Sequence, residues 1–170
     1  YGIAFQEINS MSLMAGLMTS LPYDFFIKVT GKADAKFSTL ALLPFWDGRN
    51  NAAILIRALL LNCLTIYYEE LWQKCWRDSY PQDSWAKSDP RLRPSRFTTL
   101  TDKWTWDTPL RTDYERRQAL VELDVLTAMA LGMSLYQGAA QIKLWTGKDA
   151  PVEVMRQELF DILLIHHNPC

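Results

Sequence analysis

The sequence lacks the glycine pattern with which many enzymes bring their backbone close to a bound cofactor. Its seven glycines are scattered along the chain, and no two of them form a G-x-G pair. Such a pair after a strand lets backbone amides approach a cofactor. We therefore expect no cofactor site in this chain and no catalytic residue that depends on one.

Paired cysteines and long apolar runs are also absent. The three cysteines, Cys63, Cys75 and Cys170, form no C-x-x-C pair, and the chain shows no secretory leader. The longest apolar run, ILIRALLLNCL, is interrupted by Arg57 and Asn62 and is well short of the ~20 residues that cross a bilayer. These absences predict reduced thiols, a cytoplasmic location and no membrane span.

Metal ligands and activated nucleophiles are sparse as well. His166 and His167 are neighbours, so on a helix they point about 100° apart and do not easily share an ion with Cys170. No serine lies in a nucleophile-elbow pattern. We therefore predict no metal site and no Ser–His–Asp chemistry.

What is present is typical of one globular domain. The 170 residues are 49 % apolar and 22 % charged, and they include seven tryptophans, a high number that favours much aromatic burial or a large contact surface. The net charge of −1 gives no overall attraction to nucleic acid, so binding to nucleic acid would need local basic patches. The first residue is Tyr1, which predicts a processed or truncated piece.

Hydrophobic spacing predicts several helices. Residues 13–45 read as a helix, a kink near Pro22, a second short helix, a basic loop and an apolar segment that stops at Pro44. Residues 53–78 carry apolar side chains at intervals of three and four, which predicts one helix of about seven turns, buried on two sides. Another helix begins at a Thr112 or Asp113 cap and ends at Gly132, with its buried face formed by Leu120, Leu123, Leu126, Thr127, Ala130 and Leu131.

The remaining segments complete an α+β prediction that is predominantly α-helical. Residues 1–8 alternate weakly and predict a short strand. Residues 79–109 hold four prolines and three tryptophans, which predicts a long irregular strap over a helical bundle-like core. The predicted units are residues 1–137 and a helical tail over residues 138–170.

Three stretches, in this order, carry a resemblance to a known family. Residues 3–8 (IAFQEI) are similar to its opening strand, residues 19–28 (TSLPYDFFIK) with the Leu-Pro exit at 43–44 to its recognition helix, and residues 114–135 to the helix that follows. Together they resemble the closing part of the target-recognition domain of adenine-specific DNA methyltransferases of restriction–modification and phage-defence systems. Thr19 stands where that family usually has asparagine.

The resemblance implies a DNA-binding fragment without the methyl-transfer domain. The parent enzyme would use S-adenosylmethionine and flip an adenine into an Asn-Pro-Pro-aromatic loop. Here Asn168-Pro169 is followed by Cys170, so that loop is missing. The implied partners are double-stranded DNA and the methyltransferase domain or other defence-system subunits. The alternative is a non-catalytic helical module for protein–protein interaction.

Two basic groups are the candidate DNA-phosphate contacts. The first is a loop with its flank, and the second lies in the strap: Lys28, Lys32, Lys36 and Arg49, then Arg91, Arg93 and Arg96. Cations on loops suit phosphate contacts, which position a protein on DNA without reading its sequence. The lysines equally fit a solvated face, and the strap equally fits a surface connection pinned by its tryptophans. Both alternatives stay open on sequence alone.

Overall fold

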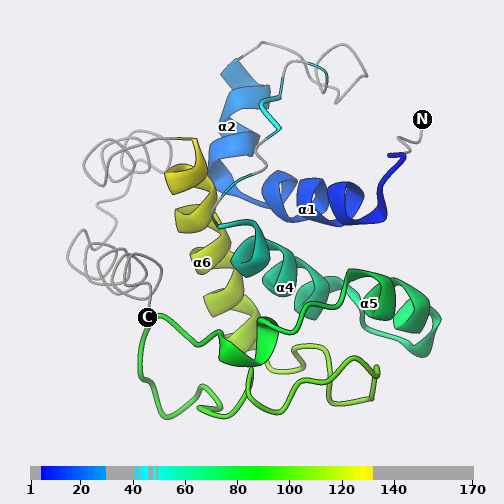
Figure 1. Cartoon of the computed structure of the whole chain (residues 1–170). Coiled ribbons are helices and arrows are strands. Elements are labelled where there is room, and N and C mark those ends of the chain that lie inside the picture. The colour runs from blue at the N-terminus through cyan, green and yellow to red at the C-terminus, as the bar shows by residue number, and fades with distance from the viewer. Residues whose placement is uncertain (1–4, 30–40, 42, 46–47, 49, 132–170) are drawn as a thin grey trace.

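The computed structural model describes residues 5–29, 41, 43–45, 48 and 50–131 (Figure 1). Its α-helices are α1 (Ile8–Met18), α2 (Leu21–Val29), α4 (Asn51–Asn62), α5 (Glu69–Cys75) and α6 (Asp113–Ala130), and its 3₁₀ turns are η1 (Ile66–Tyr68) and η2 (Tyr80–Gln82). The predicted helical character is therefore confirmed for the described part of the chain.

The expected strand over residues 1–8 is not found where the structure describes that stretch. Residues 5–7 form no strand, and Ile8 already begins α1. Residues 50–131 and the other described positions hold no strand either, so the β component of the predicted fold class is not supported there. The basic loop near residues 30–40 and the tail after residue 131 lie outside the described residues. Among the helices that are described, none is long and apolar enough to cross a membrane.

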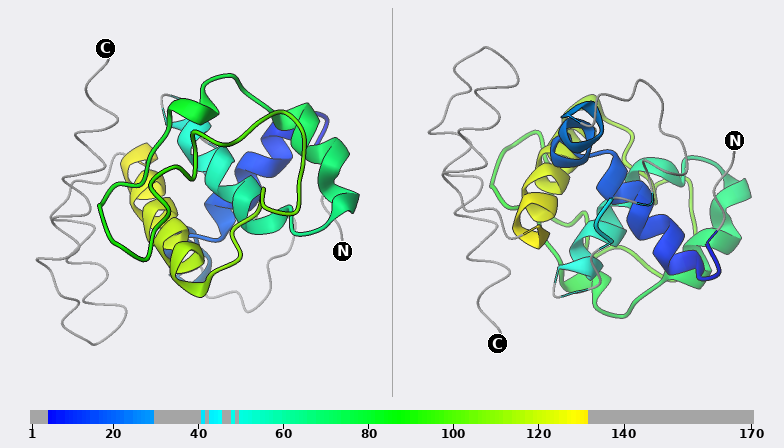
Figure 2. Two further views of the ribbon diagram at one scale, coloured as in Figure 1. Left: turned by 90° about the horizontal axis from the view of Figure 1, so that it is seen from below. Right: turned by 90° about the horizontal axis from the view of Figure 1, so that it is seen from above.

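Helix α4 is the centre of the core. Its residues from Ala53 to Leu61 are all buried, which confirms burial on more than one side. Helices α1 and α6 pack directly on it. In Figure 2 the irregular segment 83–112 is nearest the viewer from below and α1 and α2 are nearest from above, with α4 between them. The helix predicted to be buried on two sides is thus buried all round between Ala53 and Leu61.

The long helix predicted over residues 53–78 is wrong in its continuity. Helix α4 ends at Asn62, and Thr65 is extended before η1 and α5 begin. In a continuous helix the Leu60 and Leu61 carbonyls would accept from residues four positions later. Instead Leu60 O accepts from the Leu110 amide at 2.8 Å, and Leu61 O accepts from the Arg116 guanidinium at 3.1 Å.

Further hydrogen-bond donors contact the carbonyls just after the end of α4. Trp104 Nε1 donates to Cys63 O at 2.8 Å, and Arg111 Nη2 donates to Leu64 O at 2.9 Å. The donors come from segment 83–112 and from α6, distant in sequence. The carbonyls at the end of α4 are therefore satisfied by tertiary contacts, and the chain is free to turn there.

The start of α6 agrees with the sequence, whereas its buried face differs from the predicted one at several positions. Thr112 Oγ1 accepts from the Glu115 amide at 3.3 Å, as a Thr-x-x-Glu cap predicts. Leu120 was expected in the buried face but is 38 % exposed, while Glu122 is fully buried. The apolar pattern misassigned these positions because a charged side chain, bonded inside the protein, occupies part of the interior face.

Gly16 lies where α1 packs tightly against α4. A Cβ built there would lie 2.9 Å from the Ala58 Cβ and 3.2 Å from the Ile54 Cγ2. Both neighbours belong to a buried helix, so neither can move away cheaply. A residue larger than glycine would push the two helices apart.

Gly16→Ala is therefore expected to lower the free energy of unfolding by about 1–2 kcal/mol, because the steric cost exceeds the helix-propensity gain of about 1 kcal/mol. Urea denaturation measures this. The matched control, Ala15→Gly on the exposed side of α1, measures propensity alone. If Gly16→Ala stabilised the protein instead, the contact between α1 and α4 would be looser than described.

Leu60 and Leu64 test the end of α4. Leu60 is fully buried, whereas Leu64 lies beyond the helix and is partly exposed. Leu60→Ala should cost about 2–5 kcal/mol, as truncation of a buried leucine does, and Leu64→Ala should cost clearly less. Thermal or urea unfolding of both variants gives the comparison. Equal costs would indicate that the buried helix continues through residue 64.

Candidate functional site

The best-defined polar site of the described residues lies where segment 83–112 crosses α4 and α6. Its centre is Arg57 on α4, which is 1 % exposed. Arg57 Nε donates to Glu122 Oε2 at 2.6 Å, and its Nη1 donates to Asp83 Oδ2 at 2.8 Å. Arg57 thus joins α4, on which it lies, to α6 and to segment 83–112. We call Arg57, Asp83 and Glu122 the Arg57 cluster.

The remaining polar atoms of the Arg57 cluster are also bonded. Glu122 Oε1 accepts from the Ala86 amide and from Gln118 Nε2, both at 2.9 Å. Arg57 Nη1 and Nη2 also donate to the Ala53 and Ser84 carbonyls, each at 3.0 Å. Burial alone would lower the pKa of Arg57, but the two carboxylates outweigh burial and raise it. The cluster is a closed ionic contact with no vacant donor for a substrate.

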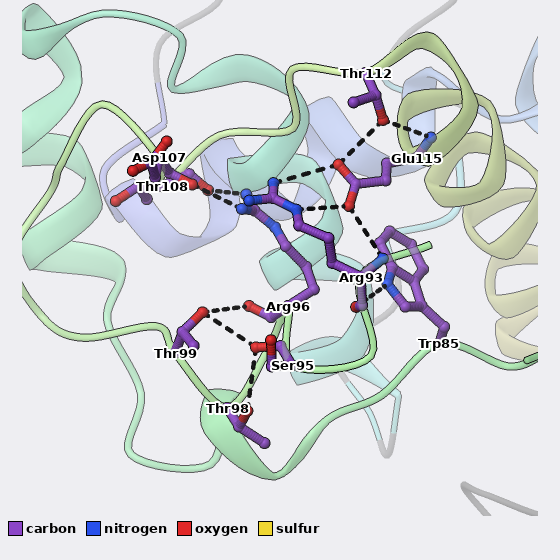
Figure 3. A network of polar contacts seen from close by, with 10 residues as sticks. All are labelled: Trp85, Arg93, Ser95, Arg96, Thr98, Thr99, Asp107, Thr108, Thr112 and Glu115. Carbon is purple, nitrogen blue, oxygen red and sulfur yellow. Dashed lines mark hydrogen bonds and ion pairs between the residues drawn. The ribbon is translucent and has the colours of Figure 1, made fainter. Parts of the chain in front are cut away.

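A second network surrounds the start of α6 (Figure 3). Arg93 Nε donates to Glu115 Oε1 at 3.0 Å, and Thr112 Oγ1 donates to Glu115 Oε2 at 3.1 Å. Burial would raise the pKa of Glu115, yet its bonds to Arg93 and Thr112 lower the pKa overall. Glu115 therefore stays ionised and bonded, which makes it a poor general acid or base.

Arg96 lies beside Arg93 and is 3 % exposed (Figure 3). Its Nη1 donates to Asp107 O at 2.7 Å, and its Nη2 donates to Thr108 O. Burial first, and then the charge of Arg93, lowers the pKa of Arg96 to about 10. Arg96 thus stays charged at neutral pH and closes the loop between residues 96 and 108 from inside.

Arg91 makes a third contact, at the surface. It pairs with Asp89 at 2.8 Å, and its guanidinium carbon lies 3.7 Å from the centre of the Tyr114 ring. Asp89 Oδ2 also accepts from the Tyr114 hydroxyl at 2.7 Å. The bond to Arg91, then the bond to Tyr114, lowers the pKa of Asp89. This carboxylate is therefore ionised and occupied.

The structure thus places the predicted site residues as follows. Arg91, Arg93 and Arg96 do lie together in segment 83–112, but each is bonded to acceptors of the protein itself. Lys28 pairs with Asp24 at 2.5 Å on the exposed side of α2. Lys32, Lys36 and Arg49 lie outside the described residues.

The sequence did not predict Asp83 and Glu122 as site residues, yet with Arg57 they form the most buried polar cluster of the described residues. The sequence signal that could have revealed this cluster is a charged residue within an apolar stripe, as at Arg57 and Glu122.

A pocket of about 300 Å³ opens beside these networks. It is lined by residues of segment 83–112: Ser84, Trp85, Ala86, Lys87, Ser88, Asp89, Leu92 and Pro94. Such a volume is at the lower end for small-molecule sites. Asp89 is already bonded to Arg91, so the pocket presents few uncommitted polar groups. Among the described residues, no group of histidine, cysteine or acidic side chains is arranged to hold a metal.

The two described cysteines are unsuited to nucleophilic chemistry. Cys63 and Cys75 are free and buried. Burial, and then the nearby Cys75, raises the pKa of Cys63 to about 12, and burial likewise raises the pKa of Cys75. Both side chains are therefore neutral thiols near neutral pH, and the thiolate is the reactive form.

Comparison with known proteins points to the C-terminal side of the chain. A family model, the shikimate 5′-dehydrogenase C-terminal domain, matches residues 131–160. The shikimate dehydrogenase (NADP(+)) of Methanopyrus kandleri is 54 % identical over 33 residues, which are 19 % of this chain. The chain spans only 11 % of that relative's length. No solved structure matches.

These matches overturn the resemblance to an adenine-specific DNA methyltransferase. The family found is a dehydrogenase domain, and the relative is named for NADP(+), so S-adenosylmethionine is wrong as the parent's cofactor. Duplex DNA and defence-system subunits as partners lose their basis for the same reason, and so does the alternative of a non-catalytic helical module. The two longer stretches, residues 19–28 and 114–135, combine common helix residues at helical spacing, and many unrelated helices share that pattern.

The Arg57 cluster predicts a large loss of stability when one partner is removed. Arg57→Met would leave two buried carboxylates without their cation, which should cost about 3–5 kcal/mol in urea denaturation. The control Arg117→Met, at an exposed position of α6, should stay within about 0.5 kcal/mol of wild type. A cost below about 1 kcal/mol for Arg57→Met would mean that water reaches the carboxylates.

Proposed function

We propose that this chain contributes the C-terminal segment of a shikimate dehydrogenase, so that its function is NADP(+)-linked oxidation and reduction of shikimate. The observation that carries the proposal is the 54 % identity over 33 residues to the shikimate dehydrogenase of Methanopyrus kandleri, together with the family match over residues 131–160. The substrate and cofactor follow from the name of that relative.

The end of α6 supports a division of the chain close to residue 131. Helix α6 ends at Ala130, and the family match begins at the next residue, Leu131. We propose that residues up to 130 form a helical unit and that the dehydrogenase segment follows it directly. This boundary lies before the one expected from sequence, at residue 137. The cytoplasmic location also stays a proposal, supported by the free thiols of Cys63 and Cys75.

We further propose that segment 83–112 serves the helical unit as a strap. Its polar contacts to α4 and α6 support this role: Asp83 bonds Arg57, the Ala86 amide donates to Glu122, and the Leu110 amide donates to Leu60 O. In this proposal the strap holds α4 and α6 together, and it takes no part in the chemistry.

The charges of the ligands indicate where binding should be sought. Shikimate is a carboxylate and NADP(+) carries phosphates, so cations are suited to hold both. The strap arginines are already bonded to the protein's own acceptors. The matched residues 131–160 contain three further cations, Lys143, Lys148 and Arg156. We propose that these supply the positive charge for the anionic ligands.

Replacing Lys143, Lys148 and Arg156 together by alanine should weaken binding of shikimate or NADP(+) to the full chain at least about tenfold, because one charge-assisted hydrogen bond contributes about 1.5–3 kcal/mol. Calorimetric titration measures binding, and the absorbance of reduced nicotinamide measures turnover. The control removes three cations from exposed positions of the helical unit, Arg77, Lys103 and Arg117, and should leave binding unchanged.

Two outcomes would contradict the proposal. Saturable binding of neither ligand by the wild-type chain at millimolar concentration would remove the proposed function for this chain. Equal weakening by both triple variants would show that only the net charge matters, and that residues 131–160 hold no specific site. Replacement of Lys143 and Lys148 by arginine, which keeps the charges, should retain binding.

A further inference from the structure

A single side chain of α6 holds the N-terminal end of α2. Asp124 Oδ1 accepts a hydrogen bond from the Leu21 amide at 2.7 Å. Leu21 is the first residue of α2, so its amide is one of the donors that a helix leaves unsatisfied at its start. The side chain of the preceding residue, Ser20, is directed to α1, where its Oγ donates to Leu17 O at 2.5 Å. The carboxylate of another helix therefore performs the capping.

The joint between α2 and α6 has no cation to balance Asp124 among the described residues. Helix α1 carries no charged residue, and the one charge of α4, Arg57, is committed to Asp83 and Glu122. On α2, Asp24 and Lys28 pair with each other at the surface. The other charged residues of α6 are Asp113, Glu115, Arg116, Arg117 and Glu122, and none forms an ion pair with Asp124.

From this geometry we propose that Asp124 is a proton-sensitive latch between α2 and α6. With a proton on Oδ2, the neutral carboxyl still accepts from the Leu21 amide through Oδ1, and the half-buried joint stays closed. Loss of that proton leaves a charge at the joint that, among the described residues, only the Leu21 amide and the positive end of α2 stabilise. Water then competes for the carboxylate, so the ionised state favours opening of α2 away from α6.

The electrostatics of Asp124 give the direction and the pH range of this effect. Burial raises the pKa of Asp124 from 3.8 to about 6, although the bond from the Leu21 amide lowers it. Between these values the closed joint binds more protons than the open one, so closing is most favourable at acidic pH and weakens as pH rises. The opening equilibrium constant should grow about tenfold from about pH 5 to about pH 8. The latch does not depend on the proposed dehydrogenase function.

Amide hydrogen exchange of the full chain, followed by NMR, tests the latch. The reporters are the Leu21 amide and the Asp24 amide, which donates to Ser20 O at 3.1 Å. After correction for intrinsic rates, their opening constants should rise about tenfold from about pH 5 to about pH 8. The Arg116 amide, bonded to Thr112 O at the other end of α6, should show no such rise.

Two variants that each lose one carboxylate distinguish a specific effect of Asp124 from a general effect of net charge. Asp124→Asn keeps an acceptor for the Leu21 amide but cannot ionise, so its opening constants should be independent of pH. Asp24→Asn removes a carboxylate from the exposed side of α2 and should keep the wild-type profile. The proposal is overturned if the wild-type profile is flat, or if Asp24→Asn abolishes the rise as Asp124→Asn does.

A second measurement covers the case in which Asp124→Asn folds poorly. In the wild-type chain, the carboxyl carbon of Asp124 and the amide of Leu21 should titrate together with a midpoint near pH 6. A midpoint near the ordinary value of about 4 for both signals would show that the joint does not distinguish the two forms of the carboxyl, and it would overturn the latch.

Discussion

Burial of the Arg57 charge is the constraint on which the rest of the described fold depends. A guanidinium inside a helical core is costly unless carboxylates and carbonyls surround it. Here the partners come from two other parts of the chain, Asp83 in segment 83–112 and Glu122 on α6. The three elements must therefore come together as a set. The irregular segment 83–112 has no helical period of its own, and these polar contacts fix its course.

Tryptophan side chains extend the same principle along segment 83–112 and its surroundings. Trp72 Nε1 donates to Thr101 O at 2.9 Å, and Trp104 Nε1 donates to Cys63 O at 2.8 Å. Each ring packs in or against the core while its N–H satisfies a carbonyl that no regular structure pairs. A segment without helix or strand can run across the core because side chains serve as its hydrogen-bond partners.

Local signals predicted the helices, while distant contacts decided where some of them end. The Thr112 cap and the α1–α2 corner depend on neighbouring residues, and the sequence contained both. The end of α4 depends on donors some fifty residues later, such as the Leu110 amide on Leu60 O, and no local pattern reveals them. Likewise, Arg57 was visible only as an interruption of an apolar run. Its partners could not be read from spacing, because three separate elements supply the charges. The family resemblance was wrong for a related reason. Apolar residues at helical spacing indicate which side chains are buried, and they carry little information about a reaction or a ligand.

The division of labour along the chain follows from where the charges are used. In the described residues, Arg57 and the arginines of segment 83–112 already satisfy carboxylates and carbonyls of the protein, and both described thiols are neutral and buried. Groups that are bonded in this way stabilise a fold, and they cannot also bind a substrate without losing those internal bonds.

The match to a dehydrogenase domain begins where α6 ends, so the sequence similarity to an enzyme and the internally bonded core occupy successive parts of the chain. Helix α6 connects them, and Asp124 is the one titratable group on it that is bonded only to the start of another helix. The proposed change in protonation at Asp124 would therefore act on the helix that directly precedes the matched segment.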